Sequence, residues 1–466
     1  MTRFVVAVAV LLGGALAAVS ATSAVGDSDV FWHLATARET LAHGLVRSDV
    51  FSWTARGAAV ATDQWLGQLL LYLGYSLGSW TGVLAVRTVA VAGLVACIAA
   101  AALVRRPASP VVSLLVALPT ILLSRFIWTE RPELIGTACF AALVLLLQLP
   151  GPRPLYLAAA ILVVWANVHG SFALGAGLLF LIAANGLITD RPLRRAYAIA
   201  AAGALLSLVL TPAGLGTLTA PGVHLFDPPR EIQEWALPDP TTAPGALWAL
   251  ILGLLVASAA LTGGARARDA ILIVPVAVLS LFAVRHTPLL AIAATPYLAD
   301  HLPRAVRALA ERMGSAIAEP AAAPARRAPA GVVAAFVLVG AALPVGGVAS
   351  APREPSEGGF PVAALDALPR GPGLLAQYDW GGWLIWRAPA TPVFVDGRLG
   401  PYRGAVLDDY RTILLARPGW REIVERRGIR WILVRPGDPV AVRAQQLGWR
   451  TVAGSPTFVL IAVSDR

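Results

Sequence analysis

The chain has 466 residues, of which 57% are hydrophobic and only 14% charged, and its formal net charge is +10. Its mean hydropathy of +0.70 excludes an ordinary soluble domain and indicates a polytopic α-helical membrane protein. The 37 basic residues are all arginines scattered over short loops, so the positive charge predicts membrane orientation and argues against nucleic-acid binding.

Apolar stretches predict about eleven transmembrane helices. The first covers residues 4–25 and is long enough to stay in the membrane as an anchor, although the small residues that close it leave a cleaved secretory signal as an alternative. Several later stretches are short, which leaves tilted, merged or re-entrant segments as alternatives. The later spans are expected at residues 81–104, 110–127, 134–149, 154–168, 171–189, 196–211, 245–263, 270–284, 288–299 and 331–350.

Arginine placement predicts the orientation of these spans, because positively charged loops tend to stay in the cytoplasm. With a cytoplasmic N-terminus, the alternate loops hold most of the arginines. Residues 300–330 then form a cytoplasmic linker before the last span at residues 331–350. The arginines assigned to the inner side are Arg3, Arg105, Arg106, Arg153, Arg191, Arg194, Arg195, Arg266, Arg268, Arg304, Arg307, Arg312, Arg326 and Arg327.

The character of the chain changes after the last span, so residues 1–350 are predicted to be a transmembrane domain and residues 351–466 a small α/β domain. Apolar runs shorten there, charges return, and strand-like pieces at residues 392–395, 429–434 and 457–463 alternate with helical ones. The odd number of spans places this domain on the extracytoplasmic side.

A run of residues directly after the first span carries two carboxylates, Asp27 and Asp29, followed by His33. Carboxylates near hydrocarbon are costly unless they bind a cation, pair with arginine or face a water-filled cavity. These three residues are therefore the candidate catalytic group. An ordinary helix N-cap at Asp29 is the alternative.

The first outer loop, residues 26–80, also holds Asp49 and Asp63 among interleaved tryptophans. Residues 64–78 are apolar with aromatic ends, which is typical of a helix that lies in the membrane interface. An aromatic anchoring belt explains the tryptophans, but it does not explain the aspartates of the loop.

Three polar clusters at the outer ends of later spans are candidates for substrate binding. Arginine beside histidine suits an anionic phosphate, because a guanidinium offers two parallel donors. The alternatives are a self-neutralising ion-pair knot for the first cluster, a backbone-bonded structural histidine for the second and a snorkelling arginine for the third. The residues concerned are Glu130, Arg131 and Glu133, then Asn167 and His169, then Arg285 and His286.

The C-terminal region adds two motifs, Tyr-Asp-Trp-Gly-Gly-Trp at residues 378–383 and Asp-Gly-Arg at residues 396–398. A glycine pair beside aromatics can form a flat surface for a sugar or an acceptor, and glycine turns that end strands are the alternative. The outer loop 212–244 is long for an unstructured connection, which favours a functional loop. The substrate-binding candidates of the two motifs are Tyr378, Asp379, Trp380, Asp396 and Arg398.

The sequence contains no P-loop, dinucleotide fingerprint, zincin motif, nucleophile elbow or paired-cysteine metal site, which disfavours nucleotide hydrolysis.

The layout and motifs resemble the GT-C superfamily of polytopic glycosyltransferases, which use polyprenyl-phosphate sugars. Asp27-Ser28-Asp29 with Phe31-Trp32-His33, followed by residues 49–53, is similar to the first loop of oligosaccharyltransferase catalytic subunits. Residues 378–382 are similar to the aromatic-Asp-aromatic-Gly acceptor motif of their soluble domain, without the paired tryptophans that begin it. The acidic motif near the start of the chain and the Asp-Gly-Arg near its end also resemble motifs at the same places in a group of bacterial membrane proteins.

The resemblance implies a GT-C-like enzyme of the bacterial cell membrane that moves a sugar or glycan from a polyprenyl-phosphate-linked donor to a glycan or protein acceptor of the cell envelope. It implies that Asp27 or Asp29 is the general base, or that Asp29 holds a divalent cation such as Mg or Mn. Arg285, Arg131 or His286 would then stabilise the leaving lipid phosphate.

Two other functions are open at this point. A transporter or flippase of lipid-linked glycans predicts charged residues inside the spans and repeat symmetry. A non-catalytic cell-envelope scaffold predicts that substitutions of the aspartates and histidines are silent. The charges cluster at the outer ends of the spans, which favours the transferase.

Overall fold

A computed structural model of the chain describes residues 13–20, 23–105, 110–219, 222–223, 233–315 and 359–464. The predicted last span, residues 316–330 of the linker before it and much of the first span lie outside the described residues. The chain divides into two compact units. The helical unit comprises Met1–Ser23 and Leu84–Ala351, and the mixed unit comprises Ala24–Val83 and Pro352–Arg466. The first outer loop and the C-terminal region therefore belong to one unit.

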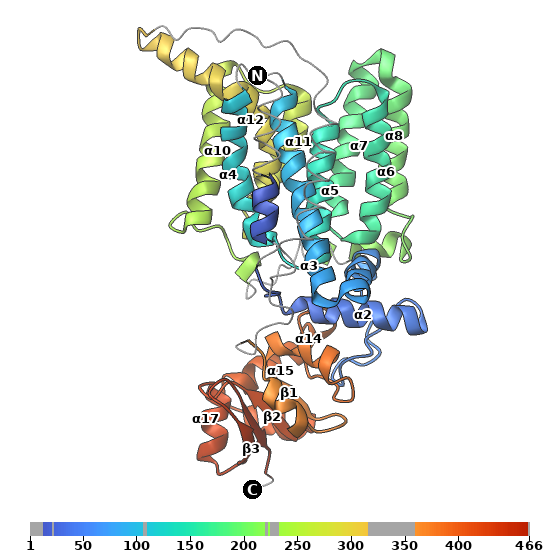
Figure 1. Cartoon of the computed structure of the whole chain (residues 1–466), viewed down its shortest axis with the longest axis vertical. Helices are drawn as coiled ribbons and strands as arrows, with labels where there is room; N and C mark the ends of the chain where they lie inside the picture. The colour runs from blue at the N-terminus through green and yellow to red at the C-terminus, as the bar shows by residue number, and fades with distance from the viewer. Residues whose placement is uncertain are drawn as a thin grey trace. The chain divides into compact units, whose positions relative to one another are not determined.

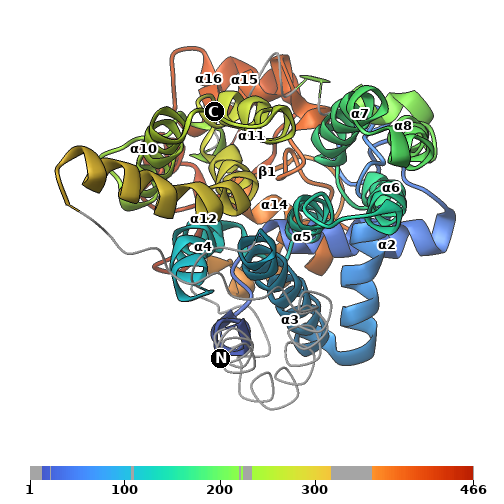
Figure 2. The ribbon, with the colours of Figure 1, turned by 90° about the horizontal axis from the view of Figure 1, so that it is seen from above.

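The helical unit is a bundle of neighbouring helices that Figure 1 shows along their length and Figure 2 nearly end-on. Each span expected between residues 81 and 299 overlaps one of them, and α12 extends beyond its expected span to Arg312. α6 lies against α8, α7 against α8, and α12 against α4, α10 and α11. Its helices are the second part of α3 (Trp65–Val104), α4 (Pro110–Ser124), α5 (Pro132–Leu146), α6 (Pro152–Val168), α7 (Phe172–Thr189), α8 (Arg194–Ser207), α10 (Ala243–Thr262), α11 (Ala267–Ser280) and α12 (Thr287–Arg312).

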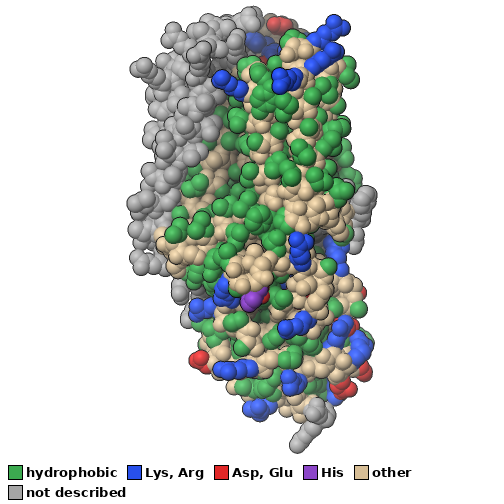
Figure 3. All heavy atoms as spheres, turned by 90° about the vertical axis from the view of Figure 1, so that its right-hand side faces the viewer, with side chains coloured by type: hydrophobic (Ala, Val, Ile, Leu, Met, Phe, Trp, Pro, Cys, Tyr) green, Lys and Arg blue, Asp and Glu red, His purple; other side chains and the backbone are tan. Residues whose placement is uncertain are grey.

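Three helices in the described part of the chain are long and apolar enough to cross a membrane, namely α3, α7 and α10. Three other helices of the described residues, α4, α5 and α6, are apolar but shorter, so the expected count of eleven spans is not confirmed. Figure 3 shows a face of the helical unit on which hydrophobic side chains gather between the ends, whereas arginines lie at the ends. This distribution fits a surface in contact with lipid.

Small residues let the helices of the bundle approach closely, as is common between membrane helices. A β-carbon added to Gly203 of α8 would lie 2.4 Å from that of Ala159 in α6. A β-carbon on Gly186 of α7 would lie 2.5 Å from the ring of Tyr197. The α6–α8 and α7–α8 contacts therefore depend on these two glycines.

Helix α3 is interrupted between the predicted interfacial helix and the predicted span. Gly78 (φ −150°, ψ 20°) and Ser79 (φ 52°, ψ −140°) are not helical. Beyond the break, a β-carbon on Gly82 would lie 1.8 Å from the carbonyl oxygen of Gly74, so the backbone passes itself closely there. Leu73 and Leu77, before the break, are 53% and 81% exposed, which gives this first part of α3 an apolar outer face.

The mixed unit contains a four-stranded sheet in the order β1-β2-β4-β3. β1 pairs parallel with β2 through Leu375 and Ile432, and β2 pairs antiparallel with β4 through Ile432 and Ile461. β3 pairs antiparallel with β4, with an irregularity after Thr451. The elements of this unit are α2 (Asp29–His43), the first part of α3, β1 (Leu374–Ala376), α14 (Tyr378–Arg387), α15 (Ala405–Leu414), α16 (Trp420–Arg427), β2 (Trp431–Val434), α17 (Pro439–Gln446), β3 (Arg450–Gly454) and β4 (Val459–Ala462).

The prediction of a strand at residues 392–395 is wrong. The strands predicted at residues 429–434 and 457–463 are present as β2 and β4. Pro392 has no N–H to donate to a ladder. The segment instead forms one isolated parallel bridge, between Val393 and Ser52 of the first loop. Val393 N donates to Phe51 O at 3.2 Å, and Trp53 N donates to Val393 O at 3.1 Å.

Candidate functional site

The acidic motif begins helix α2, and its two aspartates play different local roles. The Asp27 carboxylate accepts the backbone N–H of Asp29 at 2.9 Å, which satisfies a donor at the start of the helix. Asp29 is the first helical residue, and Ser28 is the N-cap without a side-chain cap bond. Asp29 is therefore not the N-cap, and the side chain that satisfies a backbone donor at this helix end is that of Asp27. Both carboxylates are half-buried.

His33 lies one turn further along α2 and is buried. Its side chain is 2% exposed, and its ring lies 3.6 Å from that of Trp32, centroid to centroid. Its Nδ1 lies 3.4 Å from Nε2 of Gln68 in α3. These contacts place His33 between the two helices, and its catalytic role stays a prediction.

Two glycines of the C-terminal region lie against this first turn of α2. A β-carbon added to Gly397 would lie 2.0 Å from Oδ1 of Asp29 and 3.2 Å from Nε1 of Trp32. A β-carbon on Gly382 of α14 would lie 3.0 Å from the carbonyl oxygen of Ser28 and 3.2 Å from Trp32 Cδ1. The glycines of both C-terminal motifs therefore permit close approach, a role that neither the flat-surface nor the strand-ending interpretation contained.

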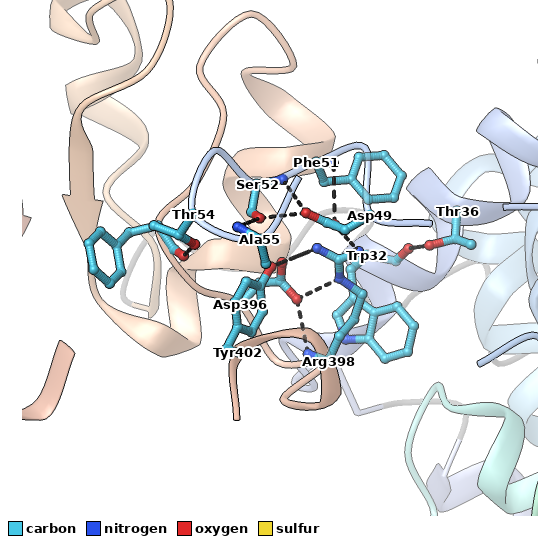
Figure 4. A network of polar contacts seen from close by, with 11 residues as sticks. Trp32, Thr36, Asp49, Phe51, Ser52, Thr54, Ala55, Asp396, Arg398 and Tyr402 are labelled. Atoms are coloured by element: carbon cyan, nitrogen blue, oxygen red, sulfur yellow. Dashed lines mark hydrogen bonds and ion pairs between the residues drawn. The ribbon is translucent and has the colours of Figure 1, made fainter. Parts of the chain in front are cut away.

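A closed polar network joins the first loop to the Asp-Gly-Arg motif (Figure 4). Arg398 donates from Nε and Nη2 to the two oxygens of Asp396, at 2.8 and 2.5 Å, and its Nη1 lies 2.6 Å from Oδ1 of Asp49. Tyr402 donates to Asp396 Oδ2 at 2.5 Å and accepts from Arg398 at 2.7 Å. The other Asp49 oxygen accepts both the N–H and the hydroxyl of Ser52.

Burial and charge shift the pKa values of this network in opposite directions at Arg398 and in the same direction at Tyr402. The side chains of Asp49 and Asp396 are fully buried, and that of Arg398 is 8% exposed. Burial alone disfavours a charged guanidinium, but the carboxylate of Asp396, with that of Asp49, outweighs it and holds the pKa of Arg398 well above its usual range. Burial and the nearby Asp396 carboxylate raise the pKa of Tyr402, so its hydroxyl stays protonated.

The helical unit also has an arginine–carboxylate cluster, formed by Arg131 and the first turn of α5, by the segment before α12 and by the short turn η4 (Gln233–Trp235). Arg285 binds Glu133 at 2.6 Å and Glu234 at 3.2 Å, and Arg131 lies 3.4 Å from Glu234. The Arg285 guanidinium also covers the ring of Trp235 at 4.5 Å. The ion pairs expected as the alternative for the first cluster are therefore present at Arg131 and Glu133, and Arg285 belongs to the same set of ion pairs.

The polar residues around this cluster bond to the backbone or to nearby hydroxyls. His286 Nδ1 lies 3.1 Å from the carbonyl oxygen of Leu279, and burial, with the charge of Arg285 as a smaller cause, lowers its pKa to about 4. His169 Nδ1 lies 2.8 Å from the Ser171 hydroxyl. Asn167 donates to the carbonyl oxygens of residues 163 and 210, at 2.9 and 3.0 Å.

Glu130 forms a buried ion pair with Arg87, a residue that the sequence analysis did not single out. Their side chains are 1% and 3% exposed. Arg87 also donates to the carbonyl oxygens of Ser20 and, at 2.9 Å, Ser23, at the end of the N-terminal helical segment. A single arginine inside an apolar stretch was the signal that could have identified it.

The residues of the Tyr-Asp-Trp-Gly-Gly-Trp motif begin α14 and separate into buried and exposed groups. Tyr378 donates its backbone N–H to the Tyr410 hydroxyl at 2.7 Å. Trp380 is 2% exposed and donates to the carbonyl oxygen of Gly359 at 2.9 Å. Asp379 is exposed and pairs with Arg435 at 3.1 Å. Of these three side chains, only that of Asp379 is largely exposed.

Three solved structures illustrate what the chain is similar to. Oligosaccharyltransferase AglB from Archaeoglobus fulgidus, in complex with an inhibitory peptide and a dolichol-phosphate, aligns over 93% of this chain and 70% of its own, with 10% identity and a TM-score of 0.56. The oligosaccharyltransferase of the same organism with Zn and sulfate aligns over 92% and 68%, with 11% identity and a TM-score of 0.52. ArnT from Cupriavidus metallidurans in the apo state covers 97% of both chains, with 16% identity and a TM-score of 0.49.

The chain has the GT-C fold. This confirms the fold that the resemblance implied, whereas the matches of the individual first-loop and C-terminal motifs stay predictions. No protein-family model and no curated protein sequence matches the chain. Because only 10% of the aligned residues are identical, the similarity to the oligosaccharyltransferase establishes the fold alone. The roles of individual residues have to be inferred from the geometry described above.

Proposed function

We propose that this GT-C protein is a membrane glycosyltransferase that moves a sugar or glycan from a polyprenyl-phosphate-linked donor to an extracytoplasmic glycan or protein acceptor. The observation that carries the proposal is the half-buried carboxylate of Asp29 at the start of α2, in a chain with this fold. The AglB neighbour was solved with a dolichol-phosphate and an inhibitory peptide, which supports a lipid-phosphate donor and an acceptor of this kind.

In the proposed reaction Asp29 is the general base. Its carboxylate takes the proton of the acceptor hydroxyl or amide as the acceptor atom forms a bond to the anomeric carbon of the sugar. The bond between that carbon and the phosphate oxygen breaks, and the polyprenyl phosphate leaves with the electron pair. The lipid phosphate already activates the sugar, so the reaction needs no nucleotide. Asp27 supports it indirectly, by capping the helix that carries Asp29.

The cluster around Arg285 is proposed to bind the lipid phosphate. Glu234 is 28% exposed and belongs to a short turn, so it is the carboxylate that a phosphate can replace most easily. Arg285 and Arg131 would then donate to phosphate oxygens, and charge-assisted bonds of this kind strengthen as negative charge develops on the leaving group. Glu133 would keep Arg285 in place.

A divalent cation at Asp29 was expected as one role of that residue, and the oligosaccharyltransferase neighbour was solved with Zn. In the described part of the chain, no group of three or more His, Cys, Asp or Glu side chains could hold a metal ion. Asp29 alone is a poor donor set for Mg or Mn, which favour several oxygen ligands. No step is therefore assigned to a metal.

The test compares the Asp29→Asn protein with wild type and with an Asp408→Asn control, whose carboxylate is 71% exposed. Loss of a general base lowers the rate by about 100-fold to 10,000-fold. We expect Asp29→Asn to lose transfer to that extent while its melting temperature stays that of wild type, and Asp408→Asn to keep full activity.

Mass spectrometry of lipids that co-purify with the Asp29→Asn protein identifies the donor to be used in this assay. Enrichment of a polyprenyl-phosphate sugar, relative to an unrelated polytopic protein from the same membranes, supports the proposed substrate class. Enrichment with no transfer by wild type would favour the flippase alternative. Bulk phospholipid alone, with a silent Asp29→Asn substitution, would favour the scaffold.

A further inference from the structure

The Asp-Gly-Arg motif lies between two elements that carry the other motifs of the chain. On one side, a β-carbon on Gly381 of α14 would lie 2.4 Å from the carbonyl oxygen of Val395 and 2.7 Å from Cα of Asp396. On the other side, Gly397 faces the Asp29 carboxylate. The segment from Val395 to Gly397 is therefore held between α14 and the first turn of α2.

This segment has little freedom to move away from Asp29. The residues on both sides of Gly397 belong to the closed network, in which Asp396 is fully buried and Arg398 bonds to Asp396, Asp49 and Tyr402. Asp396 Oδ1 also accepts the backbone N–H of Arg398 at 2.9 Å, which closes a tight turn around the glycine. The network thus fixes the backbone at the point where it meets the carboxylate.

We propose that Asp396-Gly397-Arg398 is a positioning motif that sets the place of the Asp29 carboxylate. Asp396 and Arg398 hold the turn, and Gly397 provides the space that the carboxylate occupies. The inference rests on the proposed function, because it treats Asp29 as the reacting group. It gives the C-terminal region a direct part in transfer and explains why an acidic start and a late Asp-Gly-Arg occur in the same chain.

The substitution Gly397→Ala separates this role from a purely structural one. The backbone of Gly397 has no left-handed conformation that alanine would strain, and the atom nearest to the new methyl group is the end of the flexible Asp29 side chain. The fold can therefore keep its shape while the carboxylate turns away. A displacement of about 1 Å can cost about 100-fold in rate.

Gly400→Ala is the matched control, three residues further along the same loop. A β-carbon there has no heavy atom within 4 Å, and the residue is exposed without a left-handed backbone. We expect Gly397→Ala to lower kcat by about 100-fold with KM within about twofold and with an unchanged melting temperature. Gly400→Ala should match wild type. Equal activity of the two variants would overturn the proposal, as would a Gly397→Ala protein that loses only stability.

A second measurement needs no substrate and separates failure of this inference from failure of the proposed function. Carbodiimide labelling followed by peptide mass spectrometry reports the accessibility of the Asp29 carboxylate, with exposed Asp408 as the internal reference. Gly397→Ala should change the labelling rate of Asp29 by about threefold or more while Gly400→Ala leaves it unchanged. If labelling changes but wild type shows no transfer, the positioning geometry stands and the transferase assignment fails. Unchanged labelling would overturn the positioning motif whatever the activity.

Discussion

The arginine–carboxylate cluster around Arg398 and the one around Arg285 have similar components and different exposure. In the mixed unit, Arg398 is 8% exposed and both of its carboxylate partners are fully buried. In the helical unit, Arg285 is 16% exposed and its partner Glu234 is 28% exposed. A closed cluster has no free face for a ligand, whereas a partly open one can exchange a carboxylate for a phosphate. Similar arginine–carboxylate pairs therefore hold the fold together in one unit and, as proposed, bind a phosphate in the other.

The largest effect is expected where the closed cluster loses its cation. Arg398→Ala leaves two buried carboxylates without their partner, and breaking a buried pair in this way costs about 3–5 kcal/mol. Arg435→Ala is the control, because the Arg435–Asp379 pair is about half exposed on both sides and pairs of that kind contribute about 0–1 kcal/mol. Thermal unfolding in detergent should separate the two variants clearly. Similar melting temperatures would remove the distinction between closed and open clusters.

A smaller effect, on binding and not on stability, is expected in the open cluster. Arg285→Gln removes a charge-assisted bond to phosphate, worth about 1.5–3 kcal/mol. The Kd of the purified protein for undecaprenyl phosphate should therefore rise by about tenfold to 100-fold. Arg153→Gln, at an exposed arginine that begins α6, is the control and should leave the Kd unchanged. If Arg285→Gln instead lowers the melting temperature and leaves the Kd unchanged, the open cluster stabilises the fold and does not bind phosphate.

The open cluster also predicts a dependence of stability on pH. Burial and the neighbouring Arg285 lower the pKa of His286 from 6.5 to about 4. Between these values the unfolded chain binds a proton that the folded chain does not, so stability decreases as the pH falls from 6.5 towards 4. His286→Gln should flatten that part of the curve of melting temperature against pH. A curve with the same slope in both proteins would show that His286 is not the titrating group.

Local patterns of the sequence were sufficient for much of this picture, and contacts between distant segments were not. Hydropathy located the helices of the bundle, and the acidic pair after the first span marked the start of α2. The strand expected at residues 392–395 failed because its backbone partners, Phe51 and Trp53, are more than three hundred residues away. Tyr402 belongs to none of the motifs that the sequence analysis singled out. Its role follows from its hydrogen bond to Asp396, a contact that no periodicity in the chain encodes.

The smallest predicted effect concerns two indole N–H groups of the mixed unit. Trp32 and Trp449 are 8% and 6% exposed, and within the described residues neither Nε1 has a hydrogen-bond partner. Replacement by Phe removes an unsatisfied donor, so both variants should remain folded. Trp32 Nε1 lies beside Gly397, next to the carboxylate that we propose as the base.

A reacting oxygen at Asp29 can accept a hydrogen bond from Trp32, worth about 1 kcal/mol. Trp32→Phe should therefore lower kcat/KM by about fivefold, while Trp449→Phe leaves it unchanged. An equal loss in both variants would mean that aromatic packing, and not the N–H group, is what the first turn of α2 requires from Trp32. That outcome would confine the positioning of Asp29 to Gly397 and the closed network that holds it.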